Sequence, residues 1–189
     1  MKNKEKEYKV FPWWGGYLLG SGLRKIYQNP EKILKPYVKS GMQVADIGCG
    51  MGYFTLPMTN MVGSQGKVIA VDLQKEMLRE LERRAKKLGN LTRLQLQCCS
   101  QHSIEIKKWR ENLDFILVFA IAHEVPNREG FFKEIAEAMK PGAQLLLVEP
   151  RWHVNQECFE ESIAFAKACG LKVIGEPKIN ISRTVLMEK

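Results

Sequence analysis

Two aspartates and an alternating run of glycines carry the clearest chemical signal in the chain. Gly48, Gly50 and Gly52 follow Asp46 at intervals of two residues, and Asp72 lies 24 residues after Gly48. Because glycine has no Cβ, such a turn can adopt positive φ and lets a ligand approach its backbone N–H groups closely. An acid about 20 residues after such a turn is the usual acceptor for ribose hydroxyls. The spacing therefore predicts a nucleotide-like ligand over this turn.

The glycine spacing also discriminates among nucleotide ligands. A dinucleotide turn reads Gly-x-Gly-x-x-Gly, whereas here the third glycine comes one residue early and Tyr53 occupies its usual place. A dinucleotide is therefore disfavoured. For Asp72 a second interpretation stays open, because an aspartate at this point can also cap the following helix.

Side chains that can move protons follow two later apolar segments. His123 and Glu124 come after residues 113–120, and Glu149 and His153 come after residues 143–148. Histidine titrates near neutral pH and is suited to general-base work. The alternatives are a loop cap for His123 and a helix-start position for His153. Together with a cysteine these groups lack any metal-ligand spacing, so no metal is expected.

A scaffold must bring these distant segments together, and the chain predicts one. Apolar runs and helical periodicities alternate, which favours an α/β fold with a mostly parallel sheet. Strands are expected at 43–47, 67–71, 92–97, 113–120, 143–148, 171–174 and 184–187, and helices at 29–38, 53–62, 74–88, 128–139 and 155–169. Asn29 with Pro30, and Asn127, are expected to begin helices, and Pro57 to kink its helix or mark its first turn.

Composition is that of a single globular domain of 189 residues, with 45% hydrophobic and 26% charged residues. No apolar run reaches the ~20 residues of a membrane span, and the charged N-terminus has no signal core after it. Five cysteines without a Cys-x-x-Cys motif favour reduced thiols and a cytoplasmic location. We divide the chain into an N-terminal segment, 1–28, whose aromatic stretch at 11–17 is a candidate lid, and a domain at 29–189.

The motif at 44–54 resembles motif I of class I S-adenosylmethionine-dependent methyltransferases, Asp-x-Gly-x-Gly-x-Gly. Three further segments match that family in order, at 71–78, 119–127 and 139–143. The chain looks most like its small-molecule enzymes, in the neighbourhood of menaquinone and ubiquinone biosynthesis and of arsenite methylation. The resemblance implies a Rossmann-like sheet of seven strands, mostly parallel with the last one antiparallel, and helices on both faces.

The resemblance implies the cofactor contacts, and the carboxyl ends of the strands, which ligands face in an open α/β sheet, supply the catalytic candidates. His123, His153 and Glu149 are the catalytic candidates, with His153 as the preferred base oriented by Glu149 and His123 positioning the acceptor. The expected cofactor is S-adenosyl-L-methionine, and the partner is a small-molecule substrate. The residues expected to bind the cofactor are Asp46, Gly48, Cys49, Gly50, Gly52, Asp72, Leu73, Met77, Ser100, Gln101, Phe119 and Ala120.

One segment departs from the family pattern. After the third strand the family usually has Gly-Asp-Ala, whose acid lies near the adenine edge. This chain has Cys98-Cys99-Ser100-Gln101-His102 there, and Ser100 falls at the place of the acid. A neutral acceptor makes a weaker hydrogen bond than a carboxylate. The adjacent thiols suggest a soft-metal or arsenic site, but successive strand residues point to opposite faces, which would separate them.

Other functions stay open beside the small-molecule reaction. The net charge of +8 allows an RNA or protein methyltransferase. However, the bases at 79–87 alternate with apolar residues at helical spacing, which indicates the solvent face of an amphipathic helix. A non-catalytic S-adenosylmethionine-binding protein is the third possibility.

Overall fold

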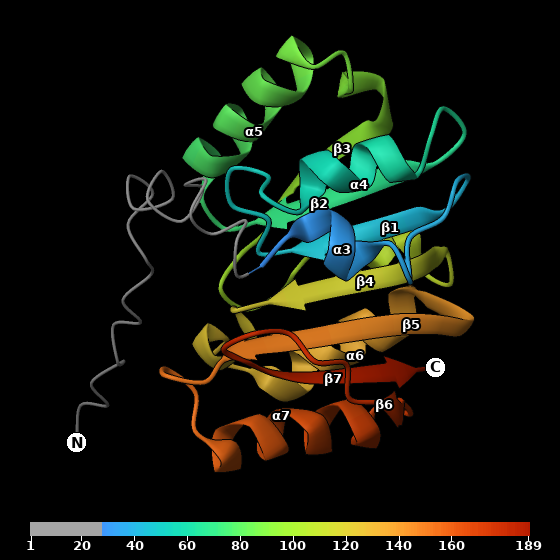
Figure 1. Ribbon diagram of the computed structural model, residues 1–189. Helices are drawn as coiled ribbons and strands as arrows, with labels where there is room; N and C mark the ends of the chain where they lie inside the picture. Colours follow the sequence, from blue (N-terminus) through green and yellow to red (C-terminus); the bar gives the residue numbers. More distant parts are fainter. Residues whose placement is uncertain (1–27) are drawn as a thin grey trace, which may run out of the picture.

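The computed structural model describes residues 28–189 as one seven-stranded sheet flanked by helices (Figure 1). The strand order is β3-β2-β1-β4-β5-β7-β6. Strands β1 to β5 pair in parallel, and β7 runs antiparallel to both β5 and β6. The predicted Rossmann-like sheet, with only its last strand reversed, is therefore confirmed. The strands are β1 (Gln43–Ile47), β2 (Lys67–Asp72), β3 (Leu94–Cys98), β4 (Leu113–Phe119), β5 (Met139–Pro150), β6 (Lys172–Gly175) and β7 (Ser182–Glu188).

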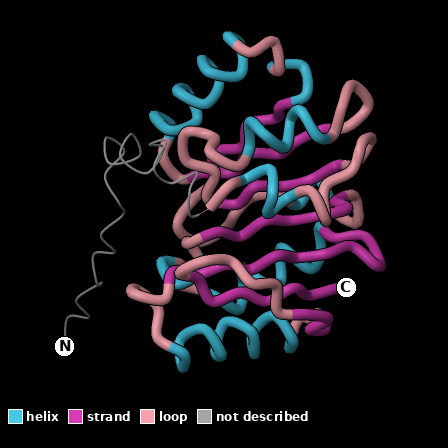
Figure 2. The backbone as a smooth tube through the Cα atoms, viewed as in Figure 1, coloured by secondary structure: helices cyan, strands magenta, loops and turns pink. Residues whose placement is uncertain are grey.

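Helices cover both faces of this sheet and enclose two apolar cores. The helices α3 (Pro30–Leu34), α4 (Thr55–Met61) and α5 (Lys75–Lys87) pack on one face, and α6 (Arg128–Ala138) and α7 (Gln156–Ala168) pack on the other. Figure 2 shows these helices and the loops that join them to the strands. Alternate residues of the central strands supply the two cores: Phe115 and Leu117 face α4, whereas Ile116 and Val118 face α6. Because both faces are covered, β4 reads as a continuous apolar run.

Side-chain caps explain where several helices begin. Asn29, Asn127 and Asn155 each accept a backbone N–H bond at the start of α3, α6 and α7, which satisfies a donor that the helix itself cannot. Pro57 is the third residue of α4, where its missing N–H leaves no helical bond unmade. The prediction that Pro57 marks a first turn is confirmed.

Two elements differ in length from the prediction. We expected a helix at 29–38, but α3 ends at Leu34, because Pro36 cannot donate to the carbonyl one turn earlier. We expected the fifth strand to begin at 143, but β5 begins at Met139. An irregular register opposite β4 and a left-handed Gly142 accommodate the Pro141-Gly142 step.

The topology fixes where a ligand can bind. The arrowheads of β4 and β5 point to the same side of the sheet (Figure 1), and the strand order reverses between β1 and β4. In open α/β sheets ligands occupy the crevice beyond the carboxyl ends at such a reversal. The candidate lid at 11–17 lies outside the described residues. None of the helices within 28–189 is long and apolar enough to cross a bilayer.

Candidate active site

The glycine turn joins the carboxyl ends of β1 and β2. The backbone N–H groups of Gly48 and Cys49 both donate to the carbonyl of Val71, at 2.8 and 3.0 Å. The next N–H, that of Gly50, donates to Asp72 Oδ2 at 2.8 Å. Gly48, Gly50 and Gly52 all have positive φ, at 77°, 52° and 89°, so the left-handed backbone that favours glycine occurs at all three. The turn and Asp72 thus form one connected unit.

The surroundings of Gly50 differ from those of the other two glycines. A Cβ on Gly48 would lie 2.7 Å from Ile121 Cδ1, and a Cβ on Gly52 would lie 2.4 Å from Leu81 Cδ1. A Cβ on Gly50 would meet no protein atom within 4 Å. Gly48 and Gly52 therefore leave room for the side chains that pack against them, whereas the backbone of Gly50 faces open space.

Asp46 and Cys49 are interior residues of this turn. Asp46 is 2% exposed, and its Oδ2 accepts a 2.6 Å bond from the hydroxyl of Thr55, which ties the end of β1 to the start of α4. Burial raises the pKa of the Cys49 thiol well above its usual value, and the charges of Asp72 and Asp46 raise it further. Cys49 is therefore a packing residue and not a nucleophile.

Asp72 retains capacity to bind a ligand. Its Oδ2 accepts from Gly50 and its Oδ1 accepts from the N–H of Gln74 at 2.9 Å. A carboxylate offers about four lone-pair positions, so two remain for hydroxyl donors. Burial raises the pKa of Asp72, although the nearby backbone N–H groups of Gln74, Gly50 and Leu73 act to lower it. The helix-cap interpretation of Asp72 holds only in part, because its carboxylate accepts the N–H of Gln74 at the start of α5 while Gln74 is itself the cap residue.

Four further residues expected to bind the cofactor lie directly after β2, in α5 and in the loop after β3. Leu73 follows β2 and is half-buried, Met77 is buried in α5, and Ser100 and Gln101 are exposed. The Ser100 hydroxyl donates to the Ser103 carbonyl and accepts from the N–H of His102, each at 3.4 Å. Ser100 is therefore held within its own turn by two long hydrogen bonds.

The adjacent cysteines diverge, as strand alternation predicts. Cys98 packs against the core that contains α5, and Cys99 packs against the core that contains α6. Burial, with a contribution from the charge of Asp72, raises the pKa of Cys99 to about 12. Among residues 28–189 no group of three histidine, cysteine or acidic side chains has the geometry of a metal site.

The end of β4 carries backbone strain that the sequence did not reveal. Ala120 has a φ of 59°, in a region that a residue with a Cβ occupies at a cost of roughly 1–3 kcal/mol. Its N–H donates to the carbonyl of Val148 at 2.7 Å. The preceding residue, Phe119, contacts the ring of Phe54 at a centroid distance of 4.4 Å. Phe119 and Ala120 thus lie at the reversal point of the sheet, against the start of α4.

A buried acid holds His123 from two sides. Glu149 Oε2 lies 2.7 Å from His123 Nδ1, and Glu149 Oε1 accepts the backbone N–H of His123 at 3.1 Å. Glu149 is 1% exposed. Because a carboxylate only accepts hydrogen bonds, Nδ1 carries the proton and Nε2 is left as the base in the neutral ring. The structure therefore assembles an acid–imidazole pair from β5 and the loop after β4.

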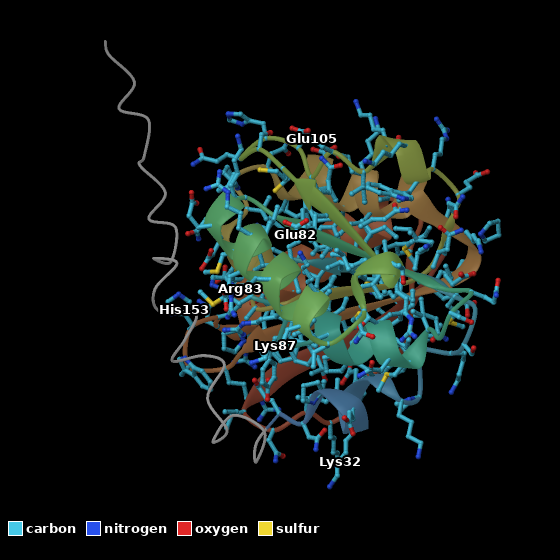
Figure 3. All side chains as sticks on the ribbon, turned by 90° about the horizontal axis from the view of Figure 1, so that it is seen from above. Lys32, Glu82, Arg83, Lys87, Glu105 and His153 are labelled. Carbon is cyan, nitrogen blue, oxygen red and sulfur yellow. The ribbon has the colours of Figure 1, made fainter. Side chains whose placement is uncertain are left out.

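The same pairing corrects our expectation for His153. We expected Glu149 to orient the ring of His153, but the carboxylate binds His123, because Ala120 and Val148 align the ends of β4 and β5. His153 is exposed and packs edge-on against the ring of His123 at a centroid distance of 4.9 Å. Figure 3 shows it at the side of the molecule to which the carboxyl ends of β4 and β5 point.

Two neighbouring charges set the electrostatics of this pair. Burial acts to lower the pKa of His123, but the hydrogen bond to Glu149 and the charges of Glu149 and Glu124 outweigh it and raise the pKa. Arg128 opposes that rise. Burial also raises the pKa of Glu124. Glu124 is not among the predicted catalytic residues, yet its Oε1 lies 3.9 Å from His123 Nε2.

The basic helix is a solvated face, as its pattern predicts. On α5, Glu80 binds both Arg83 and Arg84, with a distance of 2.7 Å in each pair. These two bonds lower the pKa of Glu80 to about 2. Figure 3 shows Glu82, Arg83 and Lys87 together on this helix, so acids are interspersed among its bases.

Comparisons with known proteins point to one family. A family model described as a methyltransferase domain matches residues 38–181. Two curated relatives are demethylmenaquinone methyltransferases, from Staphylococcus saprophyticus (25% identical over 144 residues) and Bacillus velezensis (26% over 145 residues). The alignments cover 75% and 77% of this chain, and the chain spans 60% of the length of each relative.

A solved structure is similar over almost its whole length. It is a SAM-dependent methyltransferase from Aquifex aeolicus, 26% identical, with a TM-score of 0.82. The superposition covers 95% of this chain and 98% of that one.

Proposed function

The chain belongs to the methyltransferase-domain family, and from that premise we propose that it transfers a methyl group from S-adenosyl-L-methionine to a small-molecule acceptor. The demethylmenaquinone methyltransferases among its relatives act on a small molecule by name, which supports that class of acceptor. The observation that carries the proposal is the bond from Gly50 to Asp72, which joins the glycine turn to the ribose acid beside open space.

The residues present fit the cofactor. Asp72 keeps acceptor positions for two ribose hydroxyls, and Gly50 leaves room for a ligand against its backbone. Phe119 and Ala120 stand at the reversal point of the sheet, where the methionine portion would lie. We assign cofactor contacts to the residues predicted above, with Asp46 and Cys49 acting through the shape of the turn.

The proposed chemistry needs little from the protein beyond alignment and a base. When bound, the sulfonium supplies an electrophilic methyl group. His123 accepts the proton that the acceptor loses, at Nε2, and Glu149 stabilises the imidazolium that results. His153 bounds the acceptor space and contacts the His123 ring. We propose His123 as the base in place of His153 because Glu149 orients it.

The charge around the site favours a small acceptor over RNA. Asp72, Glu124 and Glu149 gather at the carboxyl edge, where a phosphate backbone would be repelled. The five cysteines are free thiols, which supports a cytoplasmic location.

The lid at 11–17 also remains part of the proposal. Gln28, the first described residue, is buried; its carbonyl accepts from the Tyr53 hydroxyl at 2.8 Å and its Nε2 donates to Ser182 at 3.3 Å. Tyr53 follows the glycine turn and Ser182 pairs with the end of β5. This anchor supports a lid because it places the end of the segment at the carboxyl edge.

Calorimetric titration tests the proposal. The wild type should bind S-adenosylmethionine and show no measurable affinity for NAD, because Tyr53 occupies the third-glycine position of a dinucleotide turn. Asp72→Ala should weaken S-adenosylmethionine binding by about 1.5–3 kcal/mol, the usual contribution of hydrogen bonds to a charged acceptor.

Asp114→Asn is the matched control. Asp114 binds Lys140 and the N–H of Gln43 at the opposite ends of the strands, so its loss should leave affinity unchanged. Equal affinity in the wild type and in Asp72→Ala would show that the ribose assignment is wrong.

A further inference from the structure

Two hydrogen-bond acceptors face each other beside the proposed methyl-transfer site. Glu149 fixes the proton of the His123 ring on Nδ1, so Nε2 of the neutral ring presents a lone pair. Glu124 Oε1 lies 3.9 Å from that nitrogen. This separation is too long for a direct hydrogen bond. The His123 side chain is 13% exposed and that of Glu124 is 37% exposed, so both side chains reach solvent.

The gap suits a group that donates two hydrogen bonds. A donor atom about 2.9 Å from each acceptor would see them at an angle of about 85°. The two N–H bonds of an amine diverge somewhat more widely, so each hydrogen bond would bend from linear by only about 10°. We propose that the acceptor presents an amino group to this gap, and that Glu124 selects it by accepting one N–H while His123 accepts the other.

This arrangement leaves the nitrogen lone pair of the amine free to attack the methyl group. An uncharged amine has two N–H bonds and one lone pair, so two fixed acceptors hold its hydrogens and direct the lone pair away from both. The nitrogen lone pair forms the new N–C bond, the C–S bond breaks, and its electron pair stays on sulfur. The methylated nitrogen is then positively charged and loses one proton to His123 Nε2.

Other nucleophiles satisfy the pair less well. A hydroxyl or thiol has one hydrogen, so a lone pair of its oxygen or sulfur would face the second acceptor, and an unmatched polar contact is unfavourable. A carbon nucleophile donates to neither. The negative charges of Glu124 and Glu149 also attract an amine in its protonated form before it loses a proton to solvent water. The inference rests on the proposed function, because it specifies the acceptor of that reaction.

The transferred methyl group itself reports the outcome. The protein is incubated with S-adenosylmethionine that carries a ¹³C methyl group and with a small-metabolite extract of cells. The ¹³C chemical shift of the product methyl distinguishes attachment to nitrogen, oxygen, sulfur and carbon. A methyl on nitrogen is expected. A methyl on any other atom would overturn the amine assignment but leave the methyltransferase proposal standing, whereas no transfer at all would overturn both.

A pair of variants tests Glu124 with the acceptor identified in that way. Glu124→Gln should raise the KM for the acceptor by about 10- to 100-fold, because the charged hydrogen bond is lost. Glu124→Asp should recover part of that loss, and the affinity for S-adenosylmethionine should stay unchanged in both variants. Glu82→Gln makes the same change of charge on the exposed face of α5 and should behave as the wild type.

A comparison of the KM for the acceptor with the affinity for the cofactor decides whether Glu124 selects the acceptor. An unchanged KM in Glu124→Gln, or a fall in cofactor affinity equal to the rise in KM, would overturn the assignment of Glu124 as a selective residue.

Discussion

The two halves of the sheet build their parts of the site in different ways. On the β1–β2 side, backbone conformation makes the site: three left-handed glycines and one aspartate, Asp72, that accepts the N–H of Gly50. On the β4–β5 side, side chains make it: a buried acid on one strand orients a histidine that follows the other. Added atoms should therefore disturb the first half, and lost side-chain atoms should disturb the second.

The largest expected effect is on the side-chain half. His123→Ala should lower turnover by about 10²–10⁴-fold, the usual contribution of a general base. The affinity for S-adenosylmethionine should change little, because His123 contacts neither the glycine turn nor Asp72. Single-turnover transfer rates with a bound cofactor measure the effect.

His153→Ala is the control for that variant, since His153 is exposed and packs against the His123 ring, whereas Glu149 binds His123. Its turnover should fall less than tenfold. If His153→Ala proves the more damaging, Glu149 does not identify the base.

The next effect is on the backbone half. Gly50→Ala and Gly89→Ala both place a Cβ on a left-handed residue with no protein atom within 4 Å. Each should lose about 1–2 kcal/mol of unfolding free energy from strain, measured by urea denaturation. Only Gly50→Ala should also lose affinity for S-adenosylmethionine, by tenfold or more, because its Cβ would enter the ligand space. Equal affinity for S-adenosylmethionine in the two variants would show that the ligand does not lie against Gly50.

The smallest effect concerns pH, and it should act in opposite directions on stability and turnover. The folded-state pKa of His123 is raised above its ordinary 6.5, so its charged form stabilises the fold. That contribution is complete below pH 6.5 and is lost as pH rises through the folded pKa. Turnover should rise over the same interval, since the base must be neutral.

Urea unfolding of the wild type and of His123→Gln across this range measures the stability term. The charged groups that face the ring are Glu149, Glu124 and Arg128, with His153 beside it. A one-unit difference in pKa corresponds to about 1.4 kcal/mol of unfolding free energy. The difference in unfolding free energy between the wild type and His123→Gln should become smaller as pH rises, because the wild type loses the contribution of the charged ring. A difference in unfolding free energy that grows with pH would contradict the pairing of His123 with Glu149.

The sequence predicted the backbone half well, because its signal is local. Gly48 to Gly52 and Asp72 belong to one strand–turn–helix–strand unit, where spacing alone states the geometry. The order of strands and helices followed from periodicity in the same way. By contrast, α3 is shorter than predicted because Pro36 has no N–H to donate to the carbonyl one turn earlier.

The pairing of side chains in the β4–β5 half depends on strand register, which cannot be read from the periodicity of the sequence. His123, Glu149 and His153 were all named from the sequence, but the partner of Glu149 follows from the alignment of Ala120 with Val148 across two strands. Glu124 gained a role only when its distance to His123 Nε2 was known. The left-handed backbone of Ala120 had no signal, since alanine is typical of neither turns nor strain.

One measurement tests the central claim most directly. The protein is incubated with methyl-labelled S-adenosylmethionine and two fractions of a cell extract, small metabolites and total RNA. Label should appear in the metabolite fraction, stay absent from RNA, and fall at least a hundredfold in rate with His123→Ala. Label in RNA alone, or in neither fraction, would contradict a small-molecule methyltransferase.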